Sequence, residues 1–197
     1  MNIIGKVRAV ERLFKTLEKE VQKLQEQTGI HCVENCIKCC ATSNIYSTTI
    51  EFYPLAYYLY KNGLADSFLS KIEQIHDSKI CPVLNPFSIN DKQPGCMYYE
   101  QRGLICRLFS YNYHIDKYGR RLISSCKTIK VEQPEQVSKA NQILQKKPIG
   151  PKATNYYQRL QFIDFNEAQK LYPIGEAIRI AIETIVTNFH YRGKRAM

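Results

Sequence analysis

The stretch that decides the fold is Cys32-Val33-Glu34-Asn35-Cys36-Ile37-Lys38-Cys39-Cys40, which places four cysteines in one short loop. Two residues separate Cys36 from Cys39, a spacing that lets a tight turn aim two thiolates at one metal ion. Adjacent side chains tend to point in different directions, so we expect one of Cys39 and Cys40 to serve another ligand set or a second metal. The pattern predicts metal ligation rather than a set of buried thiols.

Four further cysteines follow at wide intervals: Cys81, Cys96, Cys106 and Cys126. At least three of them lie beside proline or glycine turns, as in Cys81-Pro82 and Pro94-Gly95-Cys96. Isolated cysteines are usually core residues, but turns are a poor setting for a packed core. We therefore interpret all eight cysteines as metal ligands.

The expected cellular compartment supports metal ligation over disulfide formation. The first twenty residues carry Glu11, Glu18 and Glu20 among basic residues, which is not the pattern of a signal or transit peptide. No apolar run is long enough to span a bilayer. We expect a cytoplasmic protein, and thiols there stay reduced, so dense cysteines favour metal over disulfides.

Three segments resemble the YkgJ-like CxxCxxCC family, which is described as a zinc- or iron-chelating domain. They are the Cys32 to Cys40 loop, Cys81-Pro82-Val83-Leu84, and the run from Cys96 to Arg107. The family's usual later segment is Cys, two residues, Tyr, two residues, Arg-Pro, two residues, Cys-Arg. This chain matches it at Cys96, Tyr99, Arg102, Cys106 and Arg107.

The chain departs from the family pattern at Gly103, where proline is usual, and at Ile37, where glycine is usual. Both departures concern backbone stiffness more than ligation. The resemblance implies metal binding, with Arg102 and Arg107 donating hydrogen bonds to thiolate or sulfide and Tyr99 contributing its hydroxyl or its ring.

The metal stays open between zinc and a 4Fe-4S iron–sulfur cluster, since four thiolates suit either. We lean towards the cluster because the family description allows iron and clustered thiolates suit a compact cofactor. The spacing of Cys32, Cys36 and Cys39 also matches the loop of radical S-adenosylmethionine enzymes. However, Lys38 stands where those enzymes usually have an aromatic residue, and no repeated strand–helix pattern follows.

The leading functional hypothesis is a metal-binding protein in redox or maturation chemistry with an unknown protein partner. One alternative is a group-transfer enzyme resembling protein lysine methylases, some of which are relatives of the family. Another is a structural zinc module that docks an acidic partner. The net charge of +10 would suit nucleic acid, but the basic residues are spread along the chain and no binding motif accompanies them, so nucleic-acid binding is not expected.

Helices are expected on both sides of the cysteine region, from apolar positions three and four residues apart. The predicted ranges are Val7–Thr28, Thr48–Asn62, Ala65–His76, Pro134–Lys147 and Pro173–His190. The second helix has two possible starts, Thr48 from a capping box with Glu51, or Tyr53 from the position of Pro54. Residues 79–128 are expected to be loop with short strands, and residues 149–172 are ambiguous, with a helical piece near Tyr156–Leu160.

These expectations define the fold class as mainly α, with irregular, metal-organised loops and a few short strands. They divide the chain into an N-terminal helix (1–30), a cysteine-cluster metal-binding region (31–130) and a C-terminal helical region (131–197), in one compact domain.

Overall fold

The computed structural model describes residues 1–33, 36–75, 81–85 and 95–195. The chain forms two compact units. The first comprises Met1–Glu11, Asn35–Gly103 and Leu160–Met197, and the second comprises Arg12–Glu34 and Leu104–Arg159. Two of the four boundaries between the units fall inside helices, one in α1 and one in α7.

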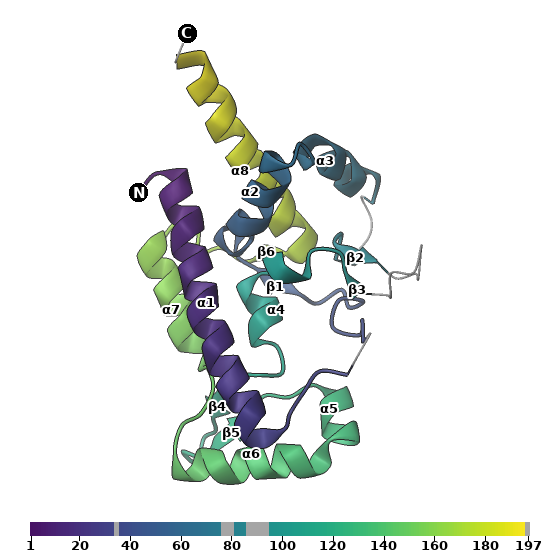
Figure 1. The fold of residues 1–197 in the computed structure, drawn as a ribbon, viewed down its shortest axis with the longest axis vertical. Helices are drawn as coiled ribbons and strands as arrows, with labels where there is room; N and C mark the ends of the chain where they lie inside the picture. Colours follow the sequence, from purple (N-terminus) through teal and green to yellow (C-terminus); the bar gives the residue numbers. More distant parts are fainter. Residues whose placement is uncertain (34–35, 76–80, 86–94, 196–197) are drawn as a thin grey trace. The chain divides into compact units, whose positions relative to one another are not determined.

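Helices dominate the described residues, which confirms the expected fold class (Figure 1). They are α1 (Ile3–Thr28), α2 (Tyr53–Lys61), α3 (Ala65–Gln74), α4 (Leu104–Leu108), α5 (Lys127–Glu132), α6 (Pro134–Lys146), α7 (Ala153–Ile163) and α8 (Ile174–Arg195). Three short antiparallel pairs accompany them: β1 (Tyr46–Ser47) with β6 (Tyr172–Pro173), β2 (Leu84–Asn85) with β3 (Gly95–Cys96), and β4 (Tyr113–Ile115) with β5 (Arg121–Ile123). No helix in these ranges is long and apolar enough to cross a bilayer.

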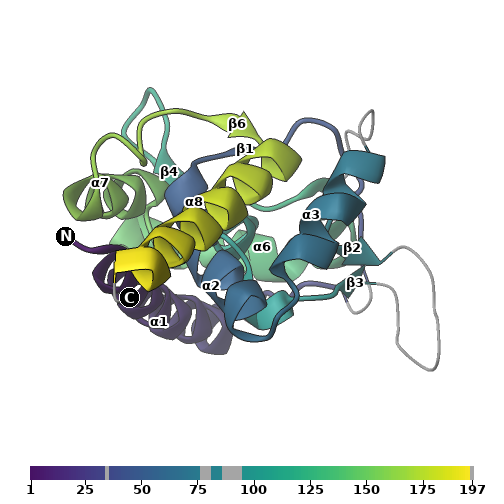
Figure 2. The same ribbon diagram turned by 90° about the horizontal axis from the view of Figure 1, so that it is seen from above.

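In the first unit, α2 and α3 pack against α8, which is the yellow helix of Figure 2. The predicted apolar stripe of α8 is confirmed, since Ile174, Ile178, Ile182 and Ile185 are all buried. Phe189, the next member of the stripe, stacks on the ring of Tyr60 at a centroid distance of 4.6 Å. This packing gives the first unit a core that is independent of the cysteines.

Both helix starts that the sequence suggested, Thr48 and Tyr53, are present at the N-terminal end of α2. The Glu51 carboxylate accepts hydrogen bonds from the amide and the hydroxyl of Thr48, at 2.9 and 3.0 Å, and a 3-10 turn follows over Thr49–Phe52. The α-helix proper then begins at Tyr53, with Pro54 in its first turn. A proline is tolerated there because the first helical amides have no intrahelical acceptor.

The second unit is built around α5, α6 and the β4–β5 pair. Its core consists of Leu24, Ile30, Ile123, Ile129, Ala140, Leu144 and Ile149. The helix predicted to start at Pro134 is confirmed, and it packs on β5. Along α1, the predicted apolar face is buried at Val10, Phe14, Leu17 and Leu24, which confirms packing on the chain's own core over a coiled coil.

Other boundaries differ from the expectation. Helix α1 begins four residues earlier, at Ile3, and α7 extends the short helical piece near Tyr156 in both directions. Helix α4 lies within the region expected to be loop, because its single turn is too short to produce an apolar period. His76, the predicted end of α3, lies outside the described residues.

Candidate metal site

The structure divides the eight cysteines between the two units. Cys36, Cys39, Cys40, Cys81 and Cys96 belong to the first unit, and Cys32, Cys106 and Cys126 belong to the second. Cys81 is buried and Cys32 is exposed, while the other six are partly exposed. The first unit therefore holds enough thiols for a complete tetrahedral site.

A tight turn positions Cys39 and Cys40. The amides of Cys40 and Ala41 both donate to the carbonyl of Ile37, at 2.9 and 3.0 Å. The Sγ atoms of Cys39 and Cys40 lie 3.8 Å apart. The expectation that these adjacent side chains point apart is therefore wrong, because the turn folds the backbone so that both thiols meet.

The β2–β3 pair positions the next two thiols. Leu84 pairs with Cys96 in this short ladder, and the Leu84 amide donates to the Cys81 carbonyl at 3.0 Å. The Cys81 amide in turn donates to the carbonyl of Cys40 at 3.4 Å. Backbone hydrogen bonds thus connect the turn that carries Cys39 and Cys40 to the segments that carry Cys81 and Cys96.

Burial and neighbouring charges shift the pKa values of these thiols. Burial raises the pKa of Cys81 to about 12, and negative charge on Cys96 and Cys39 adds to the rise. Burial also raises the pKa of Cys96. The hydrogen bond from Cys40 lowers the pKa of Cys39 to about 6, and the nearby charge of Arg102 acts in the same direction. Cys39, Cys81 and Cys96 are therefore close enough to influence one another electrostatically.

Arg102 lies beside these thiols, and Tyr99 holds it. The Arg102 guanidinium stacks on the Tyr99 ring at 3.4 Å from the centroid, and its Nε donates to the Tyr99 carbonyl at 2.9 Å. Its positive charge helps to lower the pKa of Cys39 and opposes the rise that burial causes in the pKa of Cys96. Arg102 is thus placed to offset thiolate charge, and Tyr99 acts through its ring and its carbonyl.

The sequence reasoning missed Lys71, on α3. Its Nζ donates to the carbonyl of Pro82, the residue after Cys81, at 3.2 Å, and lies 4.0 Å from the sulfur of Met97, the residue after Cys96. Lys71 therefore bridges the two segments that carry Cys81 and Cys96. No sequence signal identifies it, because it is one of many lysines and its partners are distant in the chain.

The three cysteines of the second unit have different surroundings. Cys126 is the N-cap of α5, where its Sγ accepts a hydrogen bond from the Ile129 amide at 3.4 Å. The Cys32 amide donates to the hydroxyl of Tyr111 at 2.8 Å. Cys106 lies within α4. Cys126 thus has a local structural role that does not require a metal.

Arg107, expected to flank the site, is buried with 6% of its surface exposed. It forms an ion pair with Glu18 and lies over the ring of Phe14 at 4.6 Å. Both partners belong to α1. These contacts give Arg107 a packing role in the second unit.

A metal ion needs donor atoms of suitable chemistry that also lie close together. Among the described residues, no three His, Cys, Asp or Glu side chains already converge closely enough to hold a metal ion. The thiols form instead a close Cys39–Cys40 pair with Cys81 and Cys96 within electrostatic range. Soft thiolate donors select zinc or iron, so the donor set fits such a metal, and binding would have to draw the thiols together.

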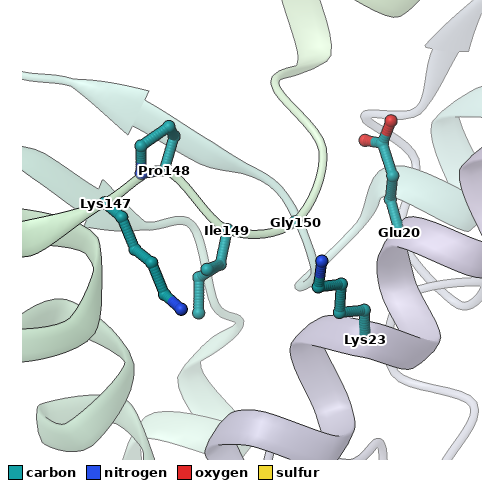
Figure 3. Close-up of a pocket in the computed structure, with 6 residues that line it drawn as sticks. All are labelled: Glu20, Lys23, Lys147, Pro148, Ile149 and Gly150. Carbon is teal, nitrogen blue, oxygen red and sulfur yellow. The ribbon is translucent and has the colours of Figure 1, made fainter.

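A cavity of about 310 Å³ lies elsewhere, in the second unit. It is lined by Glu20, Lys23, Lys147, Pro148, Ile149 and Gly150 (Figure 3). Its lining contains no cysteine, so this cavity is separate from the thiols of the first unit.

Comparison with known proteins gives one match. A family model described as "CxxCxxCC: Putative zinc- or iron-chelating domain" matches residues 31–142, a range that covers more than half of the chain and includes all eight cysteines. No curated protein and no solved structure matches the chain.

Proposed function

Because the chain belongs to the CxxCxxCC family, we propose that it is a zinc-binding protein that holds one ion with the thiolates of four cysteines of its first unit. The proposed ligands are Cys39, Cys40, Cys81 and Cys96. They share direct contacts: a thiol pair, a backbone hydrogen bond between Cys40 and Cys81, and the ladder that contains Cys96.

The observation that carries this proposal is the separation of 3.8 Å between the sulfurs of Cys39 and Cys40. Two sulfurs bound to one tetrahedral zinc, at about 2.3 Å each, lie about 3.8 Å apart. In a 4Fe-4S cluster each cysteine binds a different iron, which requires a wider separation of the sulfurs. The close pair therefore supports a single-ion site over the cluster that the family description and the clustered thiolates favoured.

The surrounding charges support the same site. Four thiolates around one divalent zinc leave two excess negative charges, and burying them is costly unless cations or hydrogen-bond donors are near. The charge of Arg102 acts on Cys39 and Cys96, and Lys71 contacts the residues that follow Cys81 and Cys96. These two cations would offset the excess negative charge.

The function of such a site is to organise the chain around it. The proposed ligands come from a turn, from the segment just before β2 and from the two-residue strand β3, which have little regular structure of their own. A structural zinc site contributes on the order of 10 kcal/mol to folding. The cysteine region would then fold only with metal, whereas the cores around α8 and α6 pack without it.

The test is metal analysis of protein purified without oxygen, together with its visible absorption spectrum. We expect a colourless protein with one zinc per chain, and loss of zinc in Cys39→Ser and Cys81→Ser. The matched control is Cys36→Ser, a partly exposed thiol of the same loop, which should retain zinc. A brown protein that contains iron and acid-labile sulfide would overturn the zinc assignment.

A second arm tests the effect on folding. Removal of the metal by a chelator should expose residues 36–47 and 81–103 to protease, while α2, α3, α6 and α8 stay protected. Metal-free protein with unchanged protease resistance in those two ranges would contradict the organising role.

A further inference from the structure

The two sulfurs of the Cys39–Cys40 pair are close enough to react with one another. They lie 3.8 Å apart, and both residues are partly exposed to solvent. A disulfide has an S–S distance of about 2.05 Å, so the sulfurs would have to move closer, through side-chain rotation and strain of the short link between adjacent residues, to reach bonding distance. By contrast, Cys81, a further proposed ligand, has 4% of its surface exposed and is shielded from dissolved oxidants.

We propose that this pair is a redox switch for the metal site, in which a hydroperoxide converts the two thiols to a Cys39–Cys40 disulfide and zinc is released. This inference rests on the proposed zinc site, because it names the event that empties it. Oxidants would thereby regulate a metal site that would otherwise have only a structural role.

The chemistry balances in two steps. One cysteine sulfur attacks the O–O bond of hydrogen peroxide, which forms a sulfenic acid and releases one water. The sulfur of the neighbouring cysteine then attacks the sulfenic sulfur, the S–O bond breaks and a second water leaves. Two zinc-bound thiolates, one peroxide and two protons from solvent thus give one disulfide and two waters, and the peroxide accepts both electrons.

Zinc release follows from the loss of ligands. A disulfide sulfur carries no negative charge, so the oxidised pair no longer supplies two of the four thiolates. The remaining thiolates of Cys81 and Cys96 form an incomplete coordination sphere.

The disulfide should also be easy to reduce. Neighbouring residues have Cα atoms about 3.8 Å apart across a trans peptide, whereas disulfide-linked residues usually have Cα atoms about 4.4–6.8 Å apart. A disulfide between adjacent residues is therefore strained, and strained disulfides have the higher reduction potentials typical of labile, regulatory bonds. Ordinary dithiols should restore the pair and allow zinc to bind again.

The experiment uses the full-length protein loaded with zinc, and its zinc content is measured before oxidation. Hydrogen peroxide is then added in equimolar amount, released zinc is followed with a chromogenic chelator, and a tryptic digest is analysed without reduction. Lys38 precedes the pair and the next cleavage site is Lys61, so Cys39 and Cys40 are the only cysteines of one tryptic peptide. A disulfide within the pair leaves this peptide whole and lighter by two hydrogens, whereas a bond from Cys39 to Cys36 links it to a second peptide.

We expect one zinc released for each Cys39–Cys40 disulfide formed, complete reversal by dithiothreitol and added zinc, and the same behaviour in Cys36→Ser and Cys126→Ser. Zinc release that accompanies a different disulfide would overturn the switch, and so would a Cys39–Cys40 disulfide in protein that keeps its zinc. Peroxide treatment that forms no disulfide would overturn it as well. Protein that takes up no zinc before oxidation would refute the proposed function itself, a result that the first measurement separates from the others.

Discussion

The ammonium group of Lys71 donates a hydrogen bond to the carbonyl of Pro82 at 3.2 Å, and this contact ties α3 to the residue that follows Cys81. The same ammonium lies 4.0 Å from the sulfur of Met97, which follows Cys96. One side chain outside the cysteine motif therefore holds two cysteine-bearing segments in register.

Replacing Lys71 should weaken metal binding without removing a ligand. Lys71→Met keeps most of the apolar stem but loses the donor, and we expect zinc affinity to fall by about tenfold, the equivalent of one charged hydrogen bond. Lys71→Arg keeps a donor and should retain most of the affinity. Competition with a chelator of known affinity measures the effect, with Lys61→Met, on α2, as the control. Equal affinity in Lys71→Met and the wild type would show that Lys71 does not position the ligands.

Cys126 should behave as a helix cap rather than as a ligand. Its Sγ accepts a hydrogen bond from the Ile129 amide at the start of α5. Serine is a favoured N-cap, so Cys126→Ser should preserve stability, whereas Cys126→Ala should cost about 1 kcal/mol. Urea unfolding measures this difference, and zinc content should stay unchanged in both variants. Loss of zinc from Cys126→Ser would instead identify Cys126 as a ligand.

Gly103 lies against the ring of Phe52, where the Cβ of the family's usual proline would meet that ring. A Cβ at position 103 would lie 2.7 Å from Cζ of Phe52, which is itself buried. Gly103→Ala should therefore destabilise the protein by about 1–3 kcal/mol through overpacking. Phe52→Leu should be less harmful in the Gly103→Ala background than in the wild type, because the smaller side chain relieves the clash. Additive free energies of unfolding in this double-mutant cycle would argue against the contact.

Stability should depend on pH through Lys6, whose Nζ lies 2.6 Å from Oδ2 of Asp164. The hydrogen bond from Lys6 lowers the pKa of Asp164. Burial opposes the charged form of Lys6, but Asp164 and Glu167 together raise its pKa. The share of stability from Asp164 is therefore present above about pH 4 and lost as the pH falls further. The share from Lys6 is present below about pH 10.5 and lost as the pH rises further.

Urea unfolding of Asp164→Asn should test this dependence. The variant should lose about 1 kcal/mol near neutral pH, and its difference from the wild type should shrink as the pH falls below about 4, because Asp164 then becomes protonated. Glu11→Gln, which removes an exposed carboxylate from the same helix as Lys6, is the control. A constant difference across this pH range would assign the effect to packing rather than to charge.

Local sequence patterns were sufficient to predict α1, α6 and α8. The apolar residues of α1 and α8 recur every three to four positions, and this period places them on one buried face whatever the partner. Proline at position 134 marked the start of α6 because its ring suits only the first turn. The one-turn helix α4 carried no such period, so only its tertiary packing reveals it.

The cysteine motif could also be recognised from the sequence, because metal ligation requires particular residue types at short, regular spacings. The sequence alone determined the fold class, the main helices and the family. The tertiary structure decided that Cys39 and Cys40 meet, that Lys71 reaches Pro82, that Arg107 is buried against α1 and that Cys126 caps α5. For Lys71 and Arg107 the physical reason is distance along the chain, because their partners come from other segments. For Cys39–Cys40 and Cys126 the partners are local, but the contact depends on a turn or a helix start whose backbone conformation is set by the rest of the fold, whereas a helix is decided by neighbours within a few residues.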